Sequence, residues 1–240
     1  MTTRLVFRED AYQREVSARV TALTEDGGLV VDASVFYPTG GGQPGDSGQL
    51  TWSDGTLRVV NTVKGAGDTI LLIPEDGAVL PQVGHNVQMK IDWDRRYNLM
   101  RVHTALHLLS VAVPFGVTGG SISEGKGRLD FDMADPPGDK EGIAEALNAM
   151  IVMDAPVTED WITDAELDAQ PDLVKTMSVK PPRGSGRIRL IRIGDASDPI
   201  DLQPCGGTHV RRTGEIGRVR LGKVEKKGRM NRRVYLHLDS

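Results

Sequence analysis

Short runs of alternating apolar and polar residues fill the first 92 positions of the chain. Runs of this kind predict β-strands, because successive side chains of a strand point to opposite faces of a sheet. Gly27-Gly28, between the first two runs, is typical of a hairpin turn. The predicted strands cover residues 15–23, 28–34, 56–63, 68–73 and 85–92. Several short strands separated by turns predict a small β-barrel or sandwich.

The apolar residues take up a helical period after residue 92. The stretch 94–110 gathers apolar side chains on one face of a helix, and Pro114 ends the pattern. Two further helices and three alternating strands follow, at residues 140–153, 164–176, 186–193, 217–224 and 233–238. The fold class is therefore predicted to be α+β. A β-rich, small barrel-like N-terminal domain would occupy residues 1–93, and an α+β domain would occupy residues 94–240.

The composition is that of a folded chain with one large or two small domains. The 240 residues are 39% hydrophobic and 26% charged, a balance that excludes a disordered or fibrous protein. No run approaches the roughly 20 apolar residues of a membrane helix, and the N-terminus lacks the apolar region of a signal peptide. A single cysteine, Cys205, excludes an internal disulfide framework and fits a reducing compartment. We therefore expect a soluble, cytoplasmic protein, and nothing in the pattern calls for a membrane or an obligate protein partner.

Charge is distributed unevenly along the chain. Residues 180–237 contain 15 Lys and Arg against 5 Asp and Glu, a balance of +10, whereas the remainder carries −14, which together give the net charge of −4. A local basic field attracts a polyanion whatever the sign of the net charge. The basic tract is equally compatible with selective contact to RNA and with strands that expose a solvated face.

Two groups of residues carry metal-binding chemistry. His103 and His107 are one turn apart on the predicted helix at 94–110, so both imidazoles point to the same side. Such a pair alone is more often packed than ligating. The segment Cys205-Gly-Gly-Thr-His209 adds the only cysteine and a third histidine, and its two glycines let the backbone bend between them. Because cysteine and histidine are the preferred zinc ligands, the four residues together predict a zinc site.

A zinc peptidase of the familiar helical type is disfavoured. Such enzymes have a glutamate directly after the first histidine as general base, whereas His103 is followed by Thr104, Ala105 and Leu106. None of these three side chains accepts a proton at neutral pH. No catalytic residue is therefore assigned, and a metal-activated water or the substrate's own groups would manage the proton.

A glycine-rich segment, Phe36-Tyr-Pro-Thr-Gly-Gly-Gly-Gln-Pro-Gly-Asp-Ser-Gly48, lies within the β-rich region. Three consecutive glycines let a ligand or another backbone come close. The segment is not a phosphate-binding P-loop, because no Gly-Lys-Ser/Thr follows, and it is not a dinucleotide fingerprint. On composition alone, a turn between strands is the better interpretation.

In order and spacing, these segments resemble the editing region of alanyl-tRNA synthetases. The resemblance rests on residues 36–48, 103–107 and 205–209, and is extended by Asp130-Phe-Asp132, Gly214-Glu-Ile-Gly217 and Lys227-Gly228. It covers nearly the whole chain, and we expect no room for an aminoacylation domain. The chain is similar to free-standing alanyl-tRNA editing proteins of the longer type, which keep both the β-rich N-terminal domain and the glycine motif.

The resemblance implies a zinc-dependent aminoacyl-tRNA deacylase that serves translation fidelity in trans, without ATP. Its substrate would be tRNA(Ala) mischarged chiefly with serine, with glycine as a second candidate. The implied zinc ligands are His103, His107, Cys205 and His209. The implied neighbours of the editing pocket are Gly40, Gly41 and Gly42. Thr118 stands where many editing regions have glutamine, a departure that bears on amino-acid selectivity rather than on the reaction class.

Threonines and basic residues complete the predicted site. Selecting serine over alanine requires a group that hydrogen-bonds the hydroxyl, and Thr104 and Thr208 are the candidates. Basic residues would contact phosphates of the acceptor stem without reading bases, so binding should weaken with salt. The candidates for this contact are Arg211, Arg212, Lys226 and Lys227. Four tightly bound donors would leave zinc no open position, so the ion would be structural or would organise the pocket from one side, whereas a weak or displaced Cys205 would leave a catalytic position. The sequence is compatible with both.

Two other functions remain open from the sequence. One is a tRNA- or RNA-binding module with a structural zinc, which would show no turnover of any aminoacyl-tRNA. The other is a zinc hydrolase of another small ester, for which the basic tract would be incidental. Salt-sensitive tRNA binding separates these two functions, and turnover of mischarged tRNA separates the deacylase from both.

Overall fold

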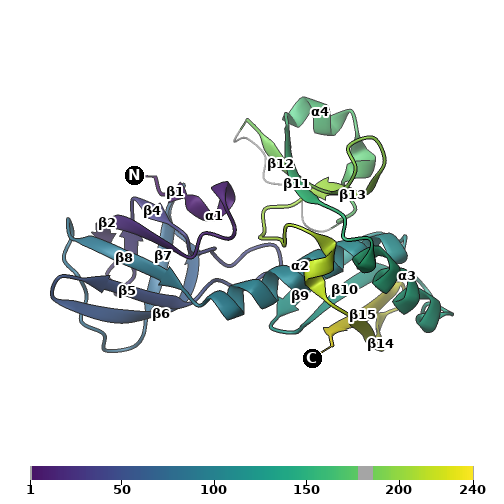
Figure 1. Cartoon of the computed structure of the whole chain (residues 1–240), viewed down its shortest axis with the longest axis horizontal. Helices are drawn as coiled ribbons and strands as arrows, with labels where there is room; N and C mark the ends of the chain where they lie inside the picture. Colours follow the sequence, from purple (N-terminus) through teal and green to yellow (C-terminus); the bar gives the residue numbers. More distant parts are fainter. Residues whose placement is uncertain (1, 178–185, 240) are drawn as a thin grey trace. The chain divides into compact units, whose positions relative to one another are not determined.

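The chain divides into two compact units, Met1–Tyr97 and Asn98–Ser240 (Figure 1). The computed structural model describes residues 2–177 and 186–239. Lys180 and Arg183 of the predicted basic tract lie outside the described residues. The predicted α+β class with an N-terminal β-barrel is confirmed. Among the described helices, none combines the length and apolarity that crossing a membrane requires.

Six strands of the first unit close into a β-barrel in the order β2-β3-β7-β6-β5-β8. They are β2 (Glu15–Leu23), β3 (Leu29–Val31), β5 (Gly48–Trp52), β6 (Gly55–Lys64), β7 (Ile70–Pro74) and β8 (Asn86–Ile91). The elements beside the barrel are β1 (Arg4–Leu5), α1 (Val6–Glu9) and β4 (Ala33–Ser34). The sequence pattern missed β5, because Leu50 is the only apolar residue between its terminal Gly48 and Trp52.

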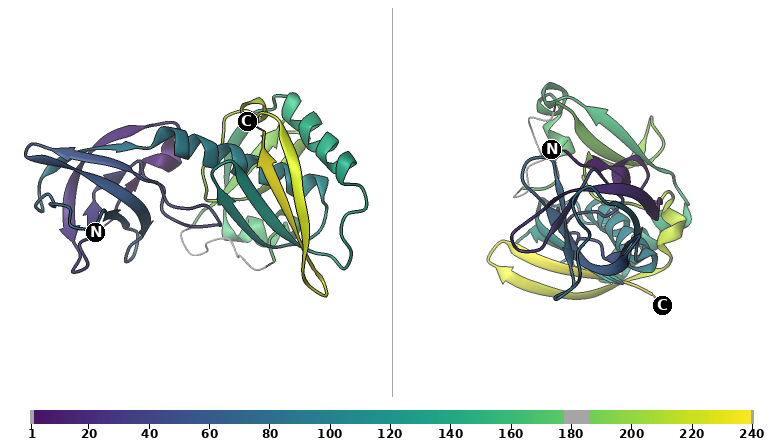
Figure 2. Two further views of the ribbon diagram at one scale, coloured as in Figure 1. Left: turned by 90° about the horizontal axis from the view of Figure 1, so that it is seen from below. Right: turned by 90° about the vertical axis from the view of Figure 1, so that its left-hand side faces the viewer.

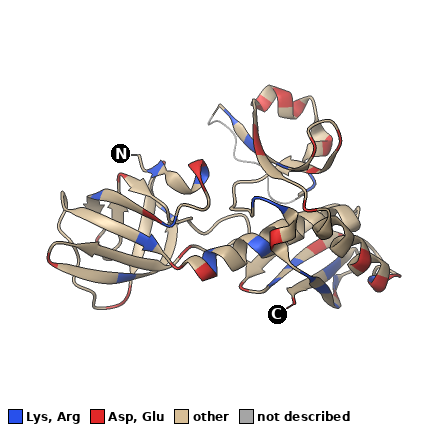
Figure 3. Ribbon diagram, in the orientation of Figure 1, with Lys and Arg blue, Asp and Glu red and all other residues tan. Residues whose placement is uncertain are grey.

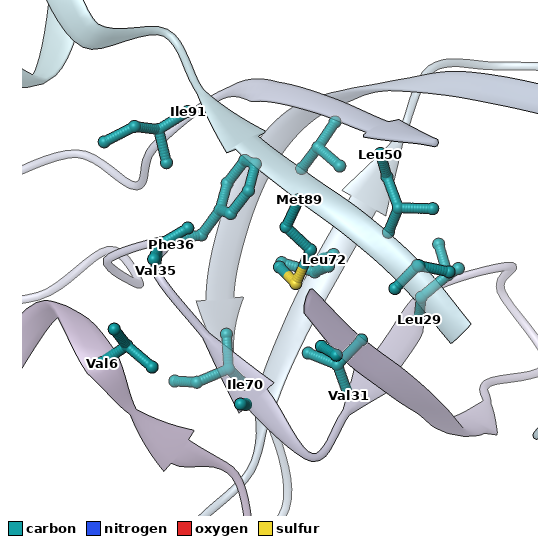
Figure 4. Close-up of a cluster of buried hydrophobic side chains, with 14 of the residues drawn as sticks. Val6, Leu29, Val31, Val35, Phe36, Leu50, Ile70, Leu72, Met89 and Ile91 are labelled. Carbon is teal, nitrogen blue, oxygen red and sulfur yellow. The ribbon is translucent and has the colours of Figure 1, made fainter. Parts of the chain in front are cut away.

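Alternation along the barrel strands directs every second side chain into one core. Leu29, Leu50, Leu72 and Met89 come from four different strands and are fully buried together (Figure 4). Burying a side chain of this size stabilises the fold by roughly 1.5–3 kcal/mol relative to leaving it exposed. The period-two pattern that predicted these strands is therefore also the pattern that fills the barrel.

The second unit contains two antiparallel sheets, of order β14-β15-β10-β9 and β11-β12-β13. Their strands are β9 (Val117–Ser123), β10 (Lys126–Asp132), β11 (Val157–Ile162), β12 (Ile188–Gly194), β13 (Pro199–Pro204), β14 (Val219–Gly228) and β15 (Asn231–Leu238). The helices are α2 (Trp93–Ala112), which begins in the first unit, α3 (Lys140–Val152) and the short η2 (Thr213–Ile216). β14 and β15 form one long hairpin, drawn in yellow in Figure 2.

Helix α2 packs closely on the four-stranded sheet. A β-carbon at Gly127 of β10 would lie 2.7 Å from Val102 and 2.9 Å from Leu106, so glycine is required for this approach. The sequence analysis missed β9 and β10, because their glycines and charged residues weaken the strand pattern. The glycine that obscured β10 in the sequence is therefore the residue that lets α2 pack on it.

The helix predicted at residues 164–176 is wrong in its length. Helix α4 spans only Asp164–Asp168, and a short 3₁₀ turn, η1, follows at Pro171–Leu173. Pro171 has no N–H for a helical hydrogen bond, and its ring disfavours helical geometry at the preceding residue. Thr163 caps α4 and Glu166 returns the hydrogen bond, so the start of the helix is well defined although its continuation is blocked.

A buried ion pair joins the first turn of α2 to the glycine-rich segment within the first unit. Arg96 is fully buried, and its Nε lies 3.0 Å from each carboxylate oxygen of Asp46. The guanidinium also donates to the carbonyl oxygens of Ala11 and Val35, at 2.9 and 2.6 Å. Asp46 accepts in turn from the backbone N–H of Tyr37 at 2.6 Å. The pair therefore satisfies three backbone groups, in two segments of the first unit, at once.

Removing one member of this pair should be costly. We expect Arg96→Met to lower the free energy of unfolding by about 3–5 kcal/mol, because it leaves the Asp46 charge buried and unpaired. Arg4→Met is the matched control, since Arg4 pairs with Glu9 through side chains that are 57% and 52% exposed and should change stability little. Urea denaturation measures both variants, and an Arg96→Met protein as stable as Arg4→Met would contradict the role given to the pair.

Candidate metal centre

Helix α2 presents His103 and His107 on one side, next to the loop that follows β13. Both side chains are 7% exposed, and their ring centroids lie 5.4 Å apart, as expected for positions one turn apart. The apolar residues Val102 and Leu106 alternate with them and face the sheet. One face of the helix therefore packs into the core while the adjacent face carries the two imidazoles.

The loop Cys205–His209 is held in place by a buried arginine. Nη1 of Arg189 donates to the carbonyl oxygens of Cys205 and Gly207, at 3.0 and 2.8 Å. The backbone N–H of Cys205 donates to the carbonyl oxygen of Arg189 at 3.1 Å. Glu159 of the neighbouring strand accepts from Nη2 of the same arginine at 2.5 Å. The three-stranded sheet thus fixes the bend that directs Cys205 and His209 toward α2.

The four predicted donors meet in one cluster. Sγ of Cys205 lies 3.4 Å from Nε2 of His103 and 3.3 Å from Nε2 of His209. One donor atom from each of the four residues falls within 4.8 Å of the others. Tetrahedral zinc bonds of about 2.0–2.3 Å place neighbouring donors roughly 3.3–3.6 Å apart. The donor types and the two shortest separations therefore fit a single tetrahedral ion such as zinc.

The electrostatics of the cluster favour a bound cation. Burial alone would raise the pKa of the Cys205 thiol, but the charges of His103 and His209 outweigh it and hold that pKa well below its ordinary value. Burial, together with the charge of His103, holds the pKa of His209 well below its ordinary value. Burial would also lower the pKa of His107, but the hydrogen bond to Asp201 raises it to about 9. The Cys205 thiolate thus attracts positive charge, and thiolate is the form of cysteine that binds metal.

Polar residues surround the cluster, and sequence reasoning missed most of them. Oδ2 of Asp201 lies 2.8 Å from Nδ1 of His107, and its Oδ1 lies 2.5 Å from Nζ of Lys175. Nε2 of Gln203 donates to Oδ2 of Asp201 at 2.7 Å. A strand signal was available: Asp201, Gln203 and Cys205 alternate along β13 and its end, so they share one face.

The two threonine candidates are both buried. Thr104 is fully buried, and its hydroxyl lies 3.1 Å from Nδ1 of His209. Thr208 is 1% exposed, within the loop between Cys205 and His209. Both residues therefore lie beside the metal cluster, and their part in recognising a substrate hydroxyl stays a prediction.

The glycine triplet forms a tight turn in the first unit. The backbones of Gly40 and Gln43 exchange two hydrogen bonds of 3.0 Å. Gly41 and Gly42 have φ angles of 56° and 81°, a region that side chains disfavour, and both are exposed. The turn interpretation of this segment is confirmed, and its part in binding substrate stays a prediction.

The four basic residues predicted to contact tRNA are all exposed, and two of them pair with a carboxylate. Lys226 and Lys227 are exposed in β14, where Nζ of Lys227 lies 3.3 Å from a carboxylate oxygen of Glu225. Figure 3 colours all described Lys and Arg residues blue. Arg211 and Arg212 are also exposed, and Arg212 pairs with Asp154 at 2.7 Å. Elsewhere in the tract, Arg232 is buried and the half-buried Arg233 pairs with Asp130. Only part of the basic tract can therefore meet a polyanion.

Two family descriptions match the chain. Residues 188–235 match the threonyl and alanyl tRNA synthetase second additional domain, a range that includes Arg189, Cys205 and His209. Residues 6–95 match the class II (A) tRNA synthetases, a range that includes the whole β-barrel.

The chain is similar to alanine–tRNA ligases and to shorter alanyl-tRNA editing proteins. The chain is 36% identical over 93% of its length to an alanine–tRNA ligase of Pyrobaculum calidifontis, of which it spans 25%. It is 34% identical over 98% of its length to the alanyl-tRNA editing protein AlaX-M of Methanosarcina acetivorans, and covers 99% of that protein. The AlaX-M of Methanosarcina mazei is 33% identical over 99% of this chain and is 97% covered. The chain thus spans about a quarter of the ligases and nearly all of the AlaX-M proteins.

Loss of a donor should abolish tight metal binding. We expect the wild-type protein to retain one divalent ion per chain after dialysis, and Cys205→Ala to bind it far more weakly. The loss should exceed the ~10–100-fold that follows removal of a residue behind a ligand. His85→Ala, which alters a histidine of the barrel unit, is the control and should keep the ion. Elemental analysis with chelator competition measures this, and a Cys205→Ala protein with wild-type affinity would show that the thiolate is not a ligand.

Proposed function

Because the chain belongs to the family of alanyl-tRNA editing proteins, we propose that it hydrolyses the aminoacyl ester of mischarged tRNA(Ala). The observation that carries the proposal is that four metal donors meet in one cluster. His103 and His107 come from α2, and Cys205 and His209 come from a loop about a hundred positions later in the sequence. We assign the chemistry to the unit at residues 98–240, which supplies all four. The substrate is proposed to be chiefly Ser-tRNA(Ala), with Gly-tRNA(Ala) second.

The reaction adds water across the ester bond between the amino acid and the terminal ribose of the tRNA. An aminoacyl ester is already reactive, so the enzyme needs only to position a water and stabilise negative charge on the carbonyl oxygen. Zinc held by His103, His107, Cys205 and His209 would supply positive charge and organise the pocket from one side. It would act as a Lewis acid on the carbonyl oxygen only if Cys205 gave up its position. Arg189 holds the donor loop in place through the carbonyl oxygens of Cys205 and Gly207.

Recognition of serine calls for a polar group close to the donor cluster that can hydrogen-bond the substrate hydroxyl. Thr104 uses its hydroxyl within the protein, on Met100 and His209, which supports a positioning role over substrate recognition. Thr118 donates to the carbonyl oxygen of Asp130 and accepts from Asn231, at 3.1 and 2.9 Å. Thr208 is the threonine that we propose for contact with the substrate hydroxyl, because it lies in the loop between the two donors Cys205 and His209.

The tRNA is proposed to bind through exposed basic residues. Lys226 and Lys227 project from the β14–β15 hairpin and would contact phosphates, which position a nucleic acid without reading its sequence. Arg211 and Arg212 lie just after the loop Cys205–His209 in sequence and are proposed to contact the acceptor end of the tRNA. The triplet Gly40–Gly42 is proposed as a further contact, because the exposed backbone of Gly41 and Gly42 admits close approach.

Two other functions would differ from the deacylase in tRNA binding or in turnover. A tRNA-binding module with structural zinc would bind tRNA in a salt-sensitive way without turnover. A zinc hydrolase of another small ester would turn over such esters without salt-sensitive tRNA binding. The match along nearly the whole AlaX-M sequence favours the deacylase over both.

Deacylation of defined substrates tests the proposal. We expect rapid loss of Ser-tRNA(Ala), slower loss of Gly-tRNA(Ala), and little loss of Ala-tRNA(Ala) with the zinc-loaded protein. His103→Ala/His107→Ala should reduce the rate on Ser-tRNA(Ala) by at least about 100-fold, because two of four donors are lost. His85→Ala serves again as the control and should retain wild-type activity.

The outcome separates the three functions. If Ser-tRNA(Ala) survives although the protein holds zinc and binds tRNA, the deacylase proposal fails and a binding module is the better account. If tRNA binding is also insensitive to salt, a small-ester hydrolase remains.

A further inference from the structure

Two of the clustered imidazoles have their outer ring nitrogen engaged by a buried side chain. Nδ1 of His107 faces Asp201, and Nδ1 of His209 faces Thr104. In both rings Nε2 is then the nitrogen left for the cluster, and for His209 it lies 3.3 Å from the Cys205 sulfur. A neutral imidazole carries its hydrogen on one nitrogen and a lone pair on the other, so these outer contacts decide which nitrogen can bind metal.

The contacts of Thr104 determine the direction of its hydrogen bonds. Its hydroxyl lies 3.0 Å from the carbonyl oxygen of Met100, which can only accept, so the single hydroxyl hydrogen is used there. The backbone N–H of Val210 donates to the same hydroxyl oxygen at 3.3 Å. The remaining contact, at 3.1 Å to Nδ1 of His209, must therefore be one in which the ring donates. Nδ1 of His209 thus carries the hydrogen, and Nε2 carries the lone pair.

Asp201 likewise fixes the ring hydrogen of His107 on Nδ1. A carboxylate only accepts hydrogen bonds, so Nδ1 of His107 must be the donor across their 2.8 Å contact. Asp201 is 2% exposed, and both of its oxygens are engaged, by Lys175 at 2.5 Å and by Gln203 at 2.7 Å. These donors fix the carboxylate plane and offset its charge, so Asp201 can hold the ring in one orientation.

We propose that Thr104 and Asp201 are positioning residues that fix His209 and His107 with hydrogen on Nδ1 and so direct both Nε2 lone pairs at one metal ion. The inference rests on the metal site proposed above and extends it to residues that do not touch the ion. Partners behind metal-binding histidines set ring orientation and ligand basicity, and their loss typically weakens metal binding about 10–100-fold. Thr104 thereby acquires a role other than contact with a substrate hydroxyl.

Long-range proton–nitrogen correlation spectra of the zinc-loaded wild-type protein test the tautomers directly. We expect hydrogen on Nδ1 and metal on Nε2 for both His107 and His209. Hydrogen on Nε2, or metal on Nδ1, in either ring would overturn the inference whatever the activity. A wild-type protein that binds no zinc would instead defeat the metal site itself, so the two failures are distinguishable.

Variants then test the effect on the metal. We expect Thr104→Val and Asp201→Leu each to weaken Zn²⁺ binding about 10–100-fold in chelator competition, and to alter the visible spectrum of the Co²⁺-substituted protein. Thr104→Ser and Asp201→Asn keep an acceptor for the ring hydrogen and should retain most of the affinity. Thr213→Val is the matched control, because Thr213 is a fully buried threonine of the same unit whose hydroxyl contacts the backbone of Met150, Ile151 and Ala155.

A structural effect is separated by measuring folding in parallel. Thr104→Val replaces a hydroxyl by a methyl group of similar size, so circular dichroism should report a folded protein while its affinity falls. Wild-type affinity and an unchanged Co²⁺ spectrum in a folded Thr104→Val protein would overturn the role of Thr104. Equal losses in Thr213→Val would also overturn the proposal, because the effect would then follow the loss of any buried hydroxyl rather than the ring contacts.

Discussion

Four electron-pair donors held together in a buried site are the constraint on which the second unit depends. Three imidazoles and a thiolate within 4.8 Å of one another present lone pairs and negative charge to the same small volume. In a low-dielectric interior such groups are stable only when a cation or protons compensate them. The surrounding structure keeps the donors in place, since Arg189 clamps the loop and Asp201 and Thr104 hold the rings.

Backbone features explain how residues so distant in sequence reach one site. Gly127 lets the Val102 and Leu106 face of α2 lie close to the four-stranded sheet. The adjacent face, which carries His103 and His107, is directed toward the loop Cys205–His209. The loop after Cys205, held by Arg189, returns His209 to the same cluster as Cys205. Within the first unit, the Arg96–Asp46 pair secures the first turn of the same helix. Helix α2 is thus fixed by packing and by charge at different points along its length.

The sequence predicted the barrel and the donor set. It did not predict the features that depend on contacts between segments far apart in the chain. Strands such as β2 and β8 alternate cleanly, and histidines one turn apart together with a single cysteine are rare enough to be informative. By contrast, Asp201 and Lys175 meet through tertiary structure, and neither stands out in the sequence. Which basic residues are exposed also depends on folding, since Arg232 is buried while Lys226, on the adjacent strand, is not.

The most direct test of the account is a zinc titration of metal-free protein, followed by the initial rate of Ser-tRNA(Ala) deacylation. The account predicts negligible activity without metal and a rate that rises in proportion to zinc and saturates at one equivalent per chain. Full deacylation by metal-free protein would contradict it. So would a zinc-saturated protein, folded and able to bind tRNA, that leaves the ester intact.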